Sequence, residues 1–387
     1  MKKEATAATR TVIKRSRLLR KPRVKEIKML NIKIKAAIPR QISSIPYLQI
    51  SDHTVSFICI AIILLFWHFV KKCTGTAFSR AAYPEKEVMT MHILVLYGGS
   101  SPERAVSVRS AQAVLGALAE TKHQTAAIDY RGGALDTTLL NAAQKADAIF
   151  LCLHGGEEEG GVLQARFEQA GIYHYTGSAP TAAALALDKA RAKHCVVNAG
   201  VPIAASKVWL PNEPAPDFTL PAVLKPLCGG SSVGVKIMES EHALAACRIE
   251  APMLLEEYLG GREYSVGVID HKTLPAVELR PKGGFYDYAH KYTPGATDEL
   301  CPAPLSDEKS SQLADLALTA FSALGLRDVA RIDFKENEEG TPCFLEANTL
   351  PGLTETSLLP LAAGVAGIEF KMLCEAVCLL AAARKKL

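Results

Sequence analysis

Two short segments near the C-terminus alternate between apolar and polar positions as β-strands do. The first is VARIDF (329–334) and the second is CFLEANT (343–349). The stretch between them, KENEEGTP, is polar and contains Gly and Pro, as hairpin loops do. The alternation predicts an apolar back, with Cys343, Leu345 and Ala347 on it. It also predicts a front face that carries Arg331, Asp333, Phe344, Glu346 and Asn348.

The front of this predicted hairpin has the chemistry of a metal and phosphate site. Carboxylate and amide oxygens suit Mg²⁺ bound to a phosphate chain, because Mg²⁺ usually takes only one or two protein carboxylates. An arginine beside them can donate two hydrogen bonds to a phosphoryl group. The pattern leaves one alternative open, a surface hairpin whose charges are solvated.

After the first ninety residues, apolar runs and turn residues follow one another in a β-α-β order. Residues 93–97 form a β-rich run that ends in GGSS, and Ser101 and Pro102 predict a helix start. Further strands are expected at 127–129 and 148–153. This order predicts a parallel sheet with ligand loops at the carboxyl ends of its strands.

The middle of the chain predicts a helical, Ala-rich stretch at 178–205, with Asp188 and Lys189 inside it. A strand at 222–226 then runs into LCGGSSVGV. This loop is a near miss to the P-loop, because Val235 stands where that motif requires Lys. A Gly/Ser loop can still cover phosphates through its backbone N–H groups, and a plain hairpin turn is the open alternative.

Charge is distributed unevenly along the 387 residues. Residues 1–50 hold 14 Lys and Arg against two acidic residues, whereas the part from Met91 holds 26 basic and 35 acidic residues. An acidic main part argues against nucleic acid as a partner. The ten cysteines form no C-x-x-C and no zinc-like spacing, so we expect reduced, mostly buried thiols.

The first 88 residues form a basic leader. It contains an apolar run at 55–70 that is borderline in length for a membrane span. A spanning segment would export the rest of the chain, and a phosphate-using enzyme would then lie where ATP is scarce, which argues against a membrane-anchored ectodomain. Met91 opens the first predicted strand directly, so we expect an over-long translated start that contributes nothing to the folded protein. An organellar transit peptide and a membrane anchor stay open, with membrane contact only if 55–70 is retained.

The ordered set of motifs resembles the D-alanine–D-alanine ligases of the ATP-grasp superfamily over Met91 to Leu387. The motifs that carry the resemblance are GGSSPER (98–104), HGGEEEGGVLQ (154–164), YTGS (175–178), LDK (187–189), LKP (224–226), GGSSVG (229–234), FYDYAHKY (285–292), ARIDF (330–334) and LEANTLPG (345–352). The resemblance implies an α/β fold, with a parallel-sheet N-terminal domain followed by a two-part ATP-grasp fold. The implied divisions are a leader at 1–88, a substrate domain at 89–178, a central subdomain at 179–256 and a catalytic domain at 257–387.

The resemblance also implies roles for particular residues. It assigns contacts with ATP to Lys189, Lys225, Glu256, Glu263 and Lys291. It assigns two Mg²⁺ or Mn²⁺ ions to Asp333, Glu346 and Asn348. The first D-alanine would bind at Glu103, assisted by a hydrogen-bonded network with Ser231 and Tyr292. His154 would lie near that subsite, and Glu159 would occupy the acidic position of its loop. Arg331 and the backbone at Gly352 would stabilise the charged intermediate, and the second carboxylate would bind at Ser357.

The implied activity is ATP-dependent ligation of two D-alanine molecules through an acyl phosphate. It would serve peptidoglycan precursor synthesis, and hence cell wall biogenesis and cell shape, in the cytoplasm. The resemblance also implies a homodimer. A D-alanine–D-lactate ligase or another ATP-grasp carboxylate–amine ligase is the first alternative, and Tyr292 favours the amine over the ester. A membrane-tethered amino-acid binding protein is the second, while a dehydrogenase lacks its glycine fingerprint.

Overall fold

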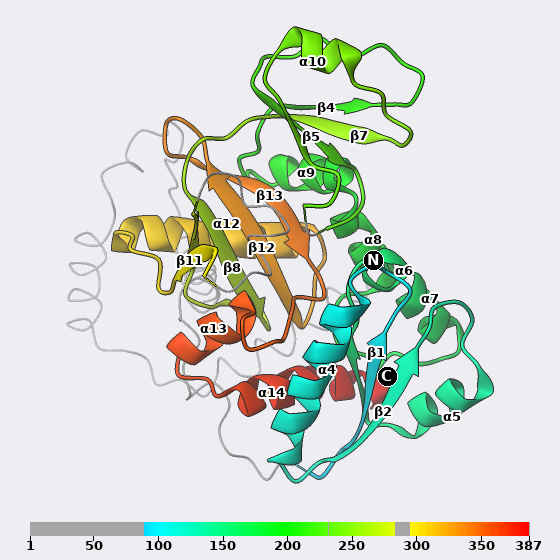
Figure 1. Ribbon diagram of the computed structural model, residues 1–387. Helices are drawn as coiled ribbons and strands as arrows, with labels where there is room; N and C mark the ends of the chain where they lie inside the picture. Colours follow the sequence, from blue (N-terminus) through cyan, green and yellow to red (C-terminus); the bar gives the residue numbers. More distant parts are fainter. Residues whose placement is uncertain (1–88, 231, 283–294, 387) are drawn as a thin grey trace, which may run out of the picture. The chain divides into compact units, whose positions relative to one another are not determined.

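The computed structural model describes residues 89–230, 232–282 and 295–386. The predictions made for the leader, Ser231, Lys291 and Tyr292 therefore lie outside the described residues. The described part contains three sheets, which carry and frame the candidate site (Figure 1).

The first sheet is parallel, as the β-α-β order predicted. It consists of β1 (His92–Gly98), β2 (Gln124–Tyr130) and β3 (Ala148–Cys152), in the order β2-β1-β3. Strand β3 is buried along its whole length, as expected of a parallel strand covered on both faces. The helices in this part are α4 (Arg104–Ala119), α5 (Thr137–Lys145), α6 (Gly156–Glu159) and α7 (Val162–Gln169).

The helix start predicted with Ser101 as N-cap and Pro102 as first helical residue is wrong by two residues, because α4 begins at Arg104. The Ser101 hydroxyl accepts a hydrogen bond from the Glu103 N–H over 3.2 Å, so residues 101–103 form a separate turn. Ser101 in turn donates to the carbonyl of His154 over 2.5 Å. The turn therefore connects the end of β1 to the loop that follows β3.

The stretch predicted as helical at 178–205 contains two helices, α8 (Pro180–Leu187) and α9 (Lys189–Asn198), and the prediction is wrong for residues 199–205, which are not helical. Asp188 separates them in an extended conformation, and its side chain caps α9 by accepting from the Arg191 N–H over 3.0 Å. The prediction that Asp188 lies inside a helix is wrong, since Asp competes for backbone donors and favours the N-cap. This break places Lys189 at the first position of α9.

The second sheet is antiparallel, in the order β4-β7-β5-β6. Its strands are β4 (Ser206–Trp209), β5 (Ala222–Pro226), β6 (Lys236–Met238) and β7 (Met253–Glu257), and α10 (Glu241–Ala246) packs against it. Buried apolar side chains on both this sheet and α10 form a small separate core.

The third sheet has its main strands in the order β11-β10-β8-β12-β13, and β9 pairs with β8. The strands are β8 (Glu263–Ile269), β9 (Lys272–Thr273), β10 (Val277–Pro281), β11 (Thr297–Leu300), β12 (Val329–Glu336) and β13 (Pro342–Asn348). The remaining helices are α12 (Asp307–Ala323), α13 (Leu358–Val365), α14 (Phe370–Ala382) and the 3₁₀ turn η3 (Ala383–Lys386). One core joins β1 and β3 to α13 and α14, and another lies between the third sheet and helices α8, α9 and α12.

The hairpin predicted from the alternation is present as β12 and β13, but its register differs at one point. A bulge follows Asp333, so that Phe334 pairs with Phe344 while Asp333 pairs with Glu346. The extra residue is Leu345, and it reverses the alternation on one side. The prediction that Phe344 lies on the polar face is therefore wrong, because Phe344 is fully buried in the core behind the sheet. The prediction that Leu345 lies on the apolar back is also wrong, because Leu345 lines the same cavities as Glu346.

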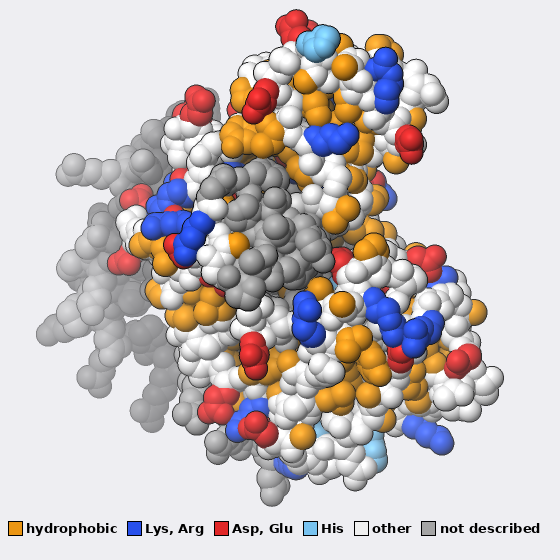
Figure 2. All heavy atoms as spheres, in the orientation of Figure 1, with side chains coloured by type: hydrophobic (Ala, Val, Ile, Leu, Met, Phe, Trp, Pro, Cys, Tyr) orange, Lys and Arg blue, Asp and Glu red, His pale blue; other side chains and the backbone are white. Residues whose placement is uncertain are grey.

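Three further observations concern the described residues as a group. The cysteines that fall in the described ranges are free thiols. Within these ranges, no helix combines the length and the apolar character that crossing a membrane requires. Acidic and basic side chains are interspersed on the face shown in Figure 2.

Candidate active site

Every predicted site residue that the structure describes lines one of two adjoining cavities. The first cavity contains the predicted residues Glu103, His154, Glu159, Arg331, Asp333, Asn348, Gly352 and Ser357. The second contains Lys225 and Glu256. Both cavities share Lys189, Glu263 and Glu346, so the structure brings the whole described set together.

The polar face of β12 and β13 lines the first cavity, and Glu346 on that face also lines the second. Asp333 lies opposite Glu346, and Arg331 lies opposite Asn348, so all four occupy adjacent cross-strand positions. Asp333 is only 8% exposed. It accepts a hydrogen bond from the Ser265 hydroxyl over 2.6 Å and an Arg331 guanidinium N–H over 2.9 Å.

This donor set fits a hard divalent cation that completes its coordination with phosphate oxygens. Asp333 and Glu346 supply carboxylates and Asn348 supplies an amide oxygen, all from the same face. In the described ranges there is no cluster of three or more His, Cys, Asp or Glu arranged to hold a metal. Two carboxylates and one amide oxygen leave coordination positions that phosphate oxygens can fill, which is the arrangement that the chemistry of Mg²⁺ favours.

Lys189 extends the charged face across the first cavity. Its ammonium lies 3.2 Å from a Glu346 carboxylate oxygen and donates to the Gly229 carbonyl over 2.5 Å. Gly229 belongs to the Gly/Ser loop, so Lys189 connects that loop to the β13 carboxylate. Glu263, at the start of β8, pairs with Lys335 over 3.1 Å.

Lys225 and Glu256, which line the second cavity, form a buried ion-pair triad with Lys193. The Glu256 carboxylate lies between two ammonium groups, with Lys193 on one oxygen and Lys225 on the other. Burial favours raising the pKa of Glu256, but the two ammonium groups outweigh it and hold that pKa below its usual range. Burial also lowers the pKa of Lys193, and Glu256 offsets part of this effect. The carboxylate is therefore ionised at neutral pH.

Lys193 is a functional candidate that the sequence did not reveal. It is 1% exposed and also donates to the Phe344 carbonyl over 2.8 Å. Its spacing of four residues from Lys189 on one helix was a possible signal, since residues at i and i+4 lie on one face. Its partner Glu256 lies more than sixty residues away, and no local pattern connects them.

His154 is held in a defined tautomer at the edge of the first cavity. Its Nδ1 lies 3.0 Å from the Leu350 carbonyl, which only accepts, so Nδ1 carries the proton. Its Nε2 then accepts from the Ser110 hydroxyl over 3.1 Å. Burial is the largest influence on its pKa and lowers it, so the ring is neutral at physiological pH.

Glu159 lies on the same side of the cavity as His154. Its carboxylate accepts from the Gly155 N–H over 3.0 Å. Burial, reinforced by the nearby charge of Glu103, raises the pKa of Glu159 to about 7. A carboxyl group in this state can donate as well as accept hydrogen bonds near neutral pH.

The turn between β13 and α13 closes the first cavity. The Ser357 hydroxyl lies 2.9 Å from the Thr354 nitrogen and 2.8 Å from the Thr354 hydroxyl. A Cβ atom on Gly352 would stand 2.8 Å from the Ser357 hydroxyl, so only Gly fits there without displacing it. Ser357 is also the N-cap of α13, and helix N-termini favour carboxylates.

Comparisons with known proteins agree with this architecture. The family model "D-ala D-ala ligase C-terminus" matches residues 204–378. The D-alanine–D-alanine ligase of Methylacidiphilum infernorum is 39% identical over 291 residues, which cover 74% of this chain and 94% of that protein. The D-alanine–D-alanine ligase of Oleidesulfovibrio alaskensis is 42% identical over 290 residues, covering 72% of this chain and 93% of that protein.

Two solved structures are similar to the described fold. The crystal structure of D-alanine–D-alanine ligase from Bacillus anthracis complexed with ATP has a TM-score of 0.66 and 27% identity, and it covers 77% of this chain and 99% of that one. The VanG D-Ala:D-Ser ligase from Enterococcus faecalis has a TM-score of 0.64 and 27% identity, with coverage of 76% and 100%.

A parallel α/β sheet followed by two antiparallel sheets, with lysines and carboxylates gathered between them, defines the chain as a ligase of the ATP-grasp class. The curated relatives, which match over nearly their whole length, identify the family within that class. The chain belongs to the D-alanine–D-alanine ligase family.

Proposed function

We propose that this chain joins two D-alanine molecules into D-alanyl-D-alanine at the expense of ATP, through an acyl phosphate, to supply peptidoglycan synthesis. The observation that carries the proposal is the convergence of three lysines, two cavity-lining carboxylates from adjacent strands and an arginine on one pair of cavities. Family membership supports the same reaction. We place this reaction in the cytoplasm, where ATP is available.

The first step activates a poor electrophile. A carboxylate oxygen of the first D-alanine attacks the γ-phosphorus of ATP, the bond to the bridging oxygen breaks, and ADP leaves. Glu103 binds the ammonium of this D-alanine, with His154 and Glu159 beside it. Lys189 and Lys225 neutralise charge on the phosphates, Glu256 and Glu263 hold the adenine and ribose, and Lys291 reaches the transferred phosphoryl group.

Asp333, Glu346 and Asn348 would hold divalent cations, with Mg²⁺ or Mn²⁺ as the candidates and two ions as the expected number. Bound there, these ions supply charge neutralisation for the phosphates. The pairing of Arg331 with Asp333 keeps a cationic donor at the same face.

The second step forms the peptide bond. The neutral amine of the second D-alanine attacks the acyl carbon, its proton is lost, and inorganic phosphate leaves. Arg331 and the Gly352 N–H stabilise the oxyanion, and removing one such donor typically lowers the rate by about 10²–10³-fold. Ser357 binds the second carboxylate, while Ser231 and Tyr292 orient the amine.

The test uses the full chain and measures ADP release and dipeptide formation with Mg²⁺. The proposal predicts ADP release that depends on D-alanine, with one D-alanyl-D-alanine formed per ADP. L-alanine replaces D-alanine in one arm, and D-lactate or D-serine joins D-alanine in two others. ADP release that needs L-alanine or no amino acid would reject the proposal. Preferential formation of the ester or of D-Ala–D-Ser would mean that D-lactate or D-serine, and not D-alanine, is the second substrate.

A further inference from the structure

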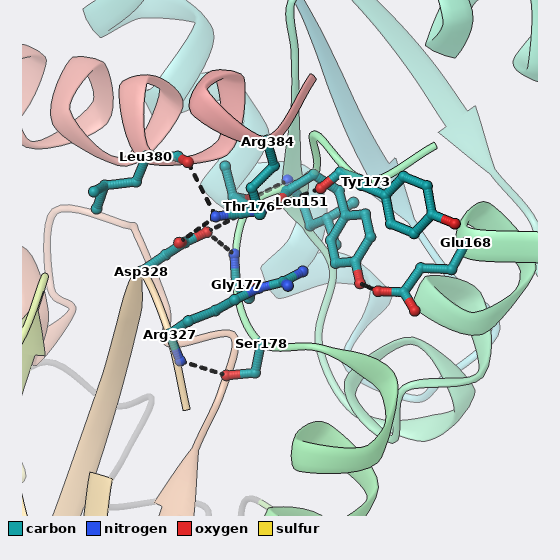
Figure 3. Close-up of polar contacts among 11 residues, drawn as sticks. Leu151, Glu168, Tyr173, Thr176, Gly177, Ser178, Arg327, Asp328, Leu380 and Arg384 are labelled. Carbon is teal, nitrogen blue, oxygen red and sulfur yellow. Dashed lines mark hydrogen bonds and ion pairs between the residues drawn. The ribbon is translucent and has the colours of Figure 1, made fainter. Parts of the chain in front are cut away.

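Arg384 and Asp328 lie where three segments of the chain meet (Figure 3), and neither residue lines either of the two cavities. Arg384 belongs to η3 after the C-terminal helix, and Asp328 precedes β12. Their side chains form a bidentate pair, with both nitrogen–oxygen distances at 2.7 Å. Such a fork fixes orientation as well as distance.

The third segment is 173–178, which follows α7 in the N-terminal part of the chain. The Arg384 guanidinium donates to the carbonyl of Tyr175 over 2.5 Å and to that of Tyr173 over 3.1 Å. Asp328 accepts from the Gly177 N–H over 2.9 Å. The pair therefore binds this segment through hydrogen bonds to its backbone. A side-chain substitution within the segment leaves these backbone groups in place.

The neighbouring residue Arg327 holds the same segment from its other side. Its Nε donates to the Gly177 carbonyl over 2.9 Å, and its guanidinium lies 5.0 Å from the centre of the Tyr175 ring. The Asp328 side chain in the pair is 3% exposed, and that of Arg384 is 15% exposed. Low exposure makes such a pair far more sensitive to loss of one partner than a surface pair is.

Segment 173–178 lies directly against the turn after β13, which carries site residues. A Cβ atom on Gly177 would stand 3.1 Å from the Leu350 side chain and 3.4 Å from the Thr349 carbonyl. Leu350 in turn accepts from His154 Nδ1 over 3.0 Å and donates its N–H to the Asn348 side chain over 3.2 Å. Asp328 itself directly precedes the strand that bears Arg331 and Asp333.

We propose that Asp328 and Arg384 are positioning residues, which fix the first D-alanine subsite relative to the strand face where phosphoryl transfer takes place. This inference rests on the proposed function. The subsite residues Glu103 and His154 come from the N-terminal part of the chain, and Arg331 and Gly352 come from the C-terminal part. The pair connects those two parts behind the site, and a misplacement of about 1 Å can cost about 10²-fold in rate.

Arg384→Met should weaken the use of D-alanine while leaving nucleotide binding nearly unchanged. The KM for D-alanine should rise at least ten-fold, because the first subsite loses its alignment. The Kd for a non-hydrolysable ATP analogue with Mg²⁺ should change less than two-fold. The candidate nucleotide contacts Lys189, Lys225 and Glu256 have no interaction with Arg384, Asp328 or segment 173–178 among the described contacts.

The matched control is Lys371→Met, which removes a cation from α14 that also pairs with the N-terminal part, at Glu120 over 3.3 Å. That pair is exposed, so both constants should stay within two-fold of wild type. Arg384→Lys keeps the charge but loses the fork, and should raise the KM for D-alanine less than Arg384→Met does. Asp328→Asn combined with Arg384→Met should be no worse than Arg384→Met alone, because the two residues act as one unit.

Circular dichroism and the thermal midpoint identify the variants that remain folded. If Arg384→Met does not fold, the same two constants are measured on Arg384→Lys. A KM for D-alanine within two-fold of wild type in a folded Arg384 variant overturns the inference. Equal weakening of D-alanine and nucleotide binding also overturns it, since that indicates a general structural role. Failure of the proposed function is distinct, because wild type itself would then form no dipeptide.

Discussion

Replacement of Lys193 by Met tests whether the buried triad stabilises the second cavity as its geometry indicates. Met approximates the length of the lysine stem but leaves the Glu256 carboxylate without one of its two cations. Removing one partner of a buried pair typically costs about 3–5 kcal/mol of folding free energy. Lys225 still contacts the other Glu256 oxygen, so we expect a loss of about 3 kcal/mol, at the low end of that range.

The pH dependence of this loss has a definite sign. The pKa of Glu256 is held below its usual range in the folded protein, so its contribution to stability is present above the ordinary carboxyl pKa and disappears as pH falls through the folded value. Lys193→Met raises the folded pKa of Glu256. The difference in stability between wild type and variant should therefore be greatest near neutral pH and shrink in acid.

The assay is urea unfolding followed by far-ultraviolet circular dichroism at pH 7 and pH 4. The control is Lys385→Met, which removes a half-exposed pair with Asp147 and should cost less than about 1 kcal/mol. The double variant Lys193→Met with Glu256→Gln should lose less stability than the sum of the losses of the two single variants, because it leaves no unpaired carboxylate. A Lys193→Met loss below about 1 kcal/mol at pH 7 would refute the reasoning.

Three further predictions concern the first cavity. Asp333→Asn or Glu346→Gln should nearly abolish ADP release while the circular dichroism spectrum stays unchanged, because the candidate cation face loses a carboxylate. Glu159 prefers its protonated form in the folded protein, so wild-type stability should fall as pH rises from about 4.5 to about 7, and Glu159→Gln should flatten that fall in urea unfolding. Ser110→Ala should raise the KM for D-alanine several-fold, since the His154 ring loses the donor at Nε2.

Each of these predictions has a result that contradicts it. Wild-type turnover in either carboxylate variant would remove the metal role from the β12–β13 face. An unchanged pH profile in Glu159→Gln would mean that another group titrates. For Ser110→Ala, a KM equal to that of wild type would show that the His154 ring is held well enough by Leu350 alone.

Local pattern in the sequence predicted the strands and the polar residues of the hairpin, because alternation and Gly/Pro punctuation are short-range signals. The other candidate site residues were assigned through the resemblance to a known family. The β12–β13 hairpin was predicted from the alternation of apolar and polar residues along each strand, and Asp333, Glu346 and Asn348 do share its polar face. Phe344 was assigned to the wrong face because a bulge is a matter of cross-strand pairing, which the alternation of one strand does not encode. The break between α8 and α9 had a local signal in Asp188, a good N-cap residue, that the Ala-rich composition obscured.

Other parts of the arrangement depend on contacts between distant segments. Lys193 pairs with Glu256 beneath the surface of the second cavity, Ser110 on α4 contacts His154, and Arg384 contacts the Tyr175 carbonyl. None of these partners stands at a spacing that strand or helix periodicity connects. Such residues become visible only when the packing of the sheets is known.

The central claim is that the site activates the D-alanine carboxylate by transferring a phosphoryl group to it. The most direct measurement follows ¹⁸O from D-alanine labelled in its carboxylate into the inorganic phosphate released during dipeptide synthesis. The account predicts that each phosphate carries one carboxylate-derived oxygen, because that oxygen bonds to phosphorus before the second amine displaces it. Phosphate that contains no label, released in step with the dipeptide, would contradict it.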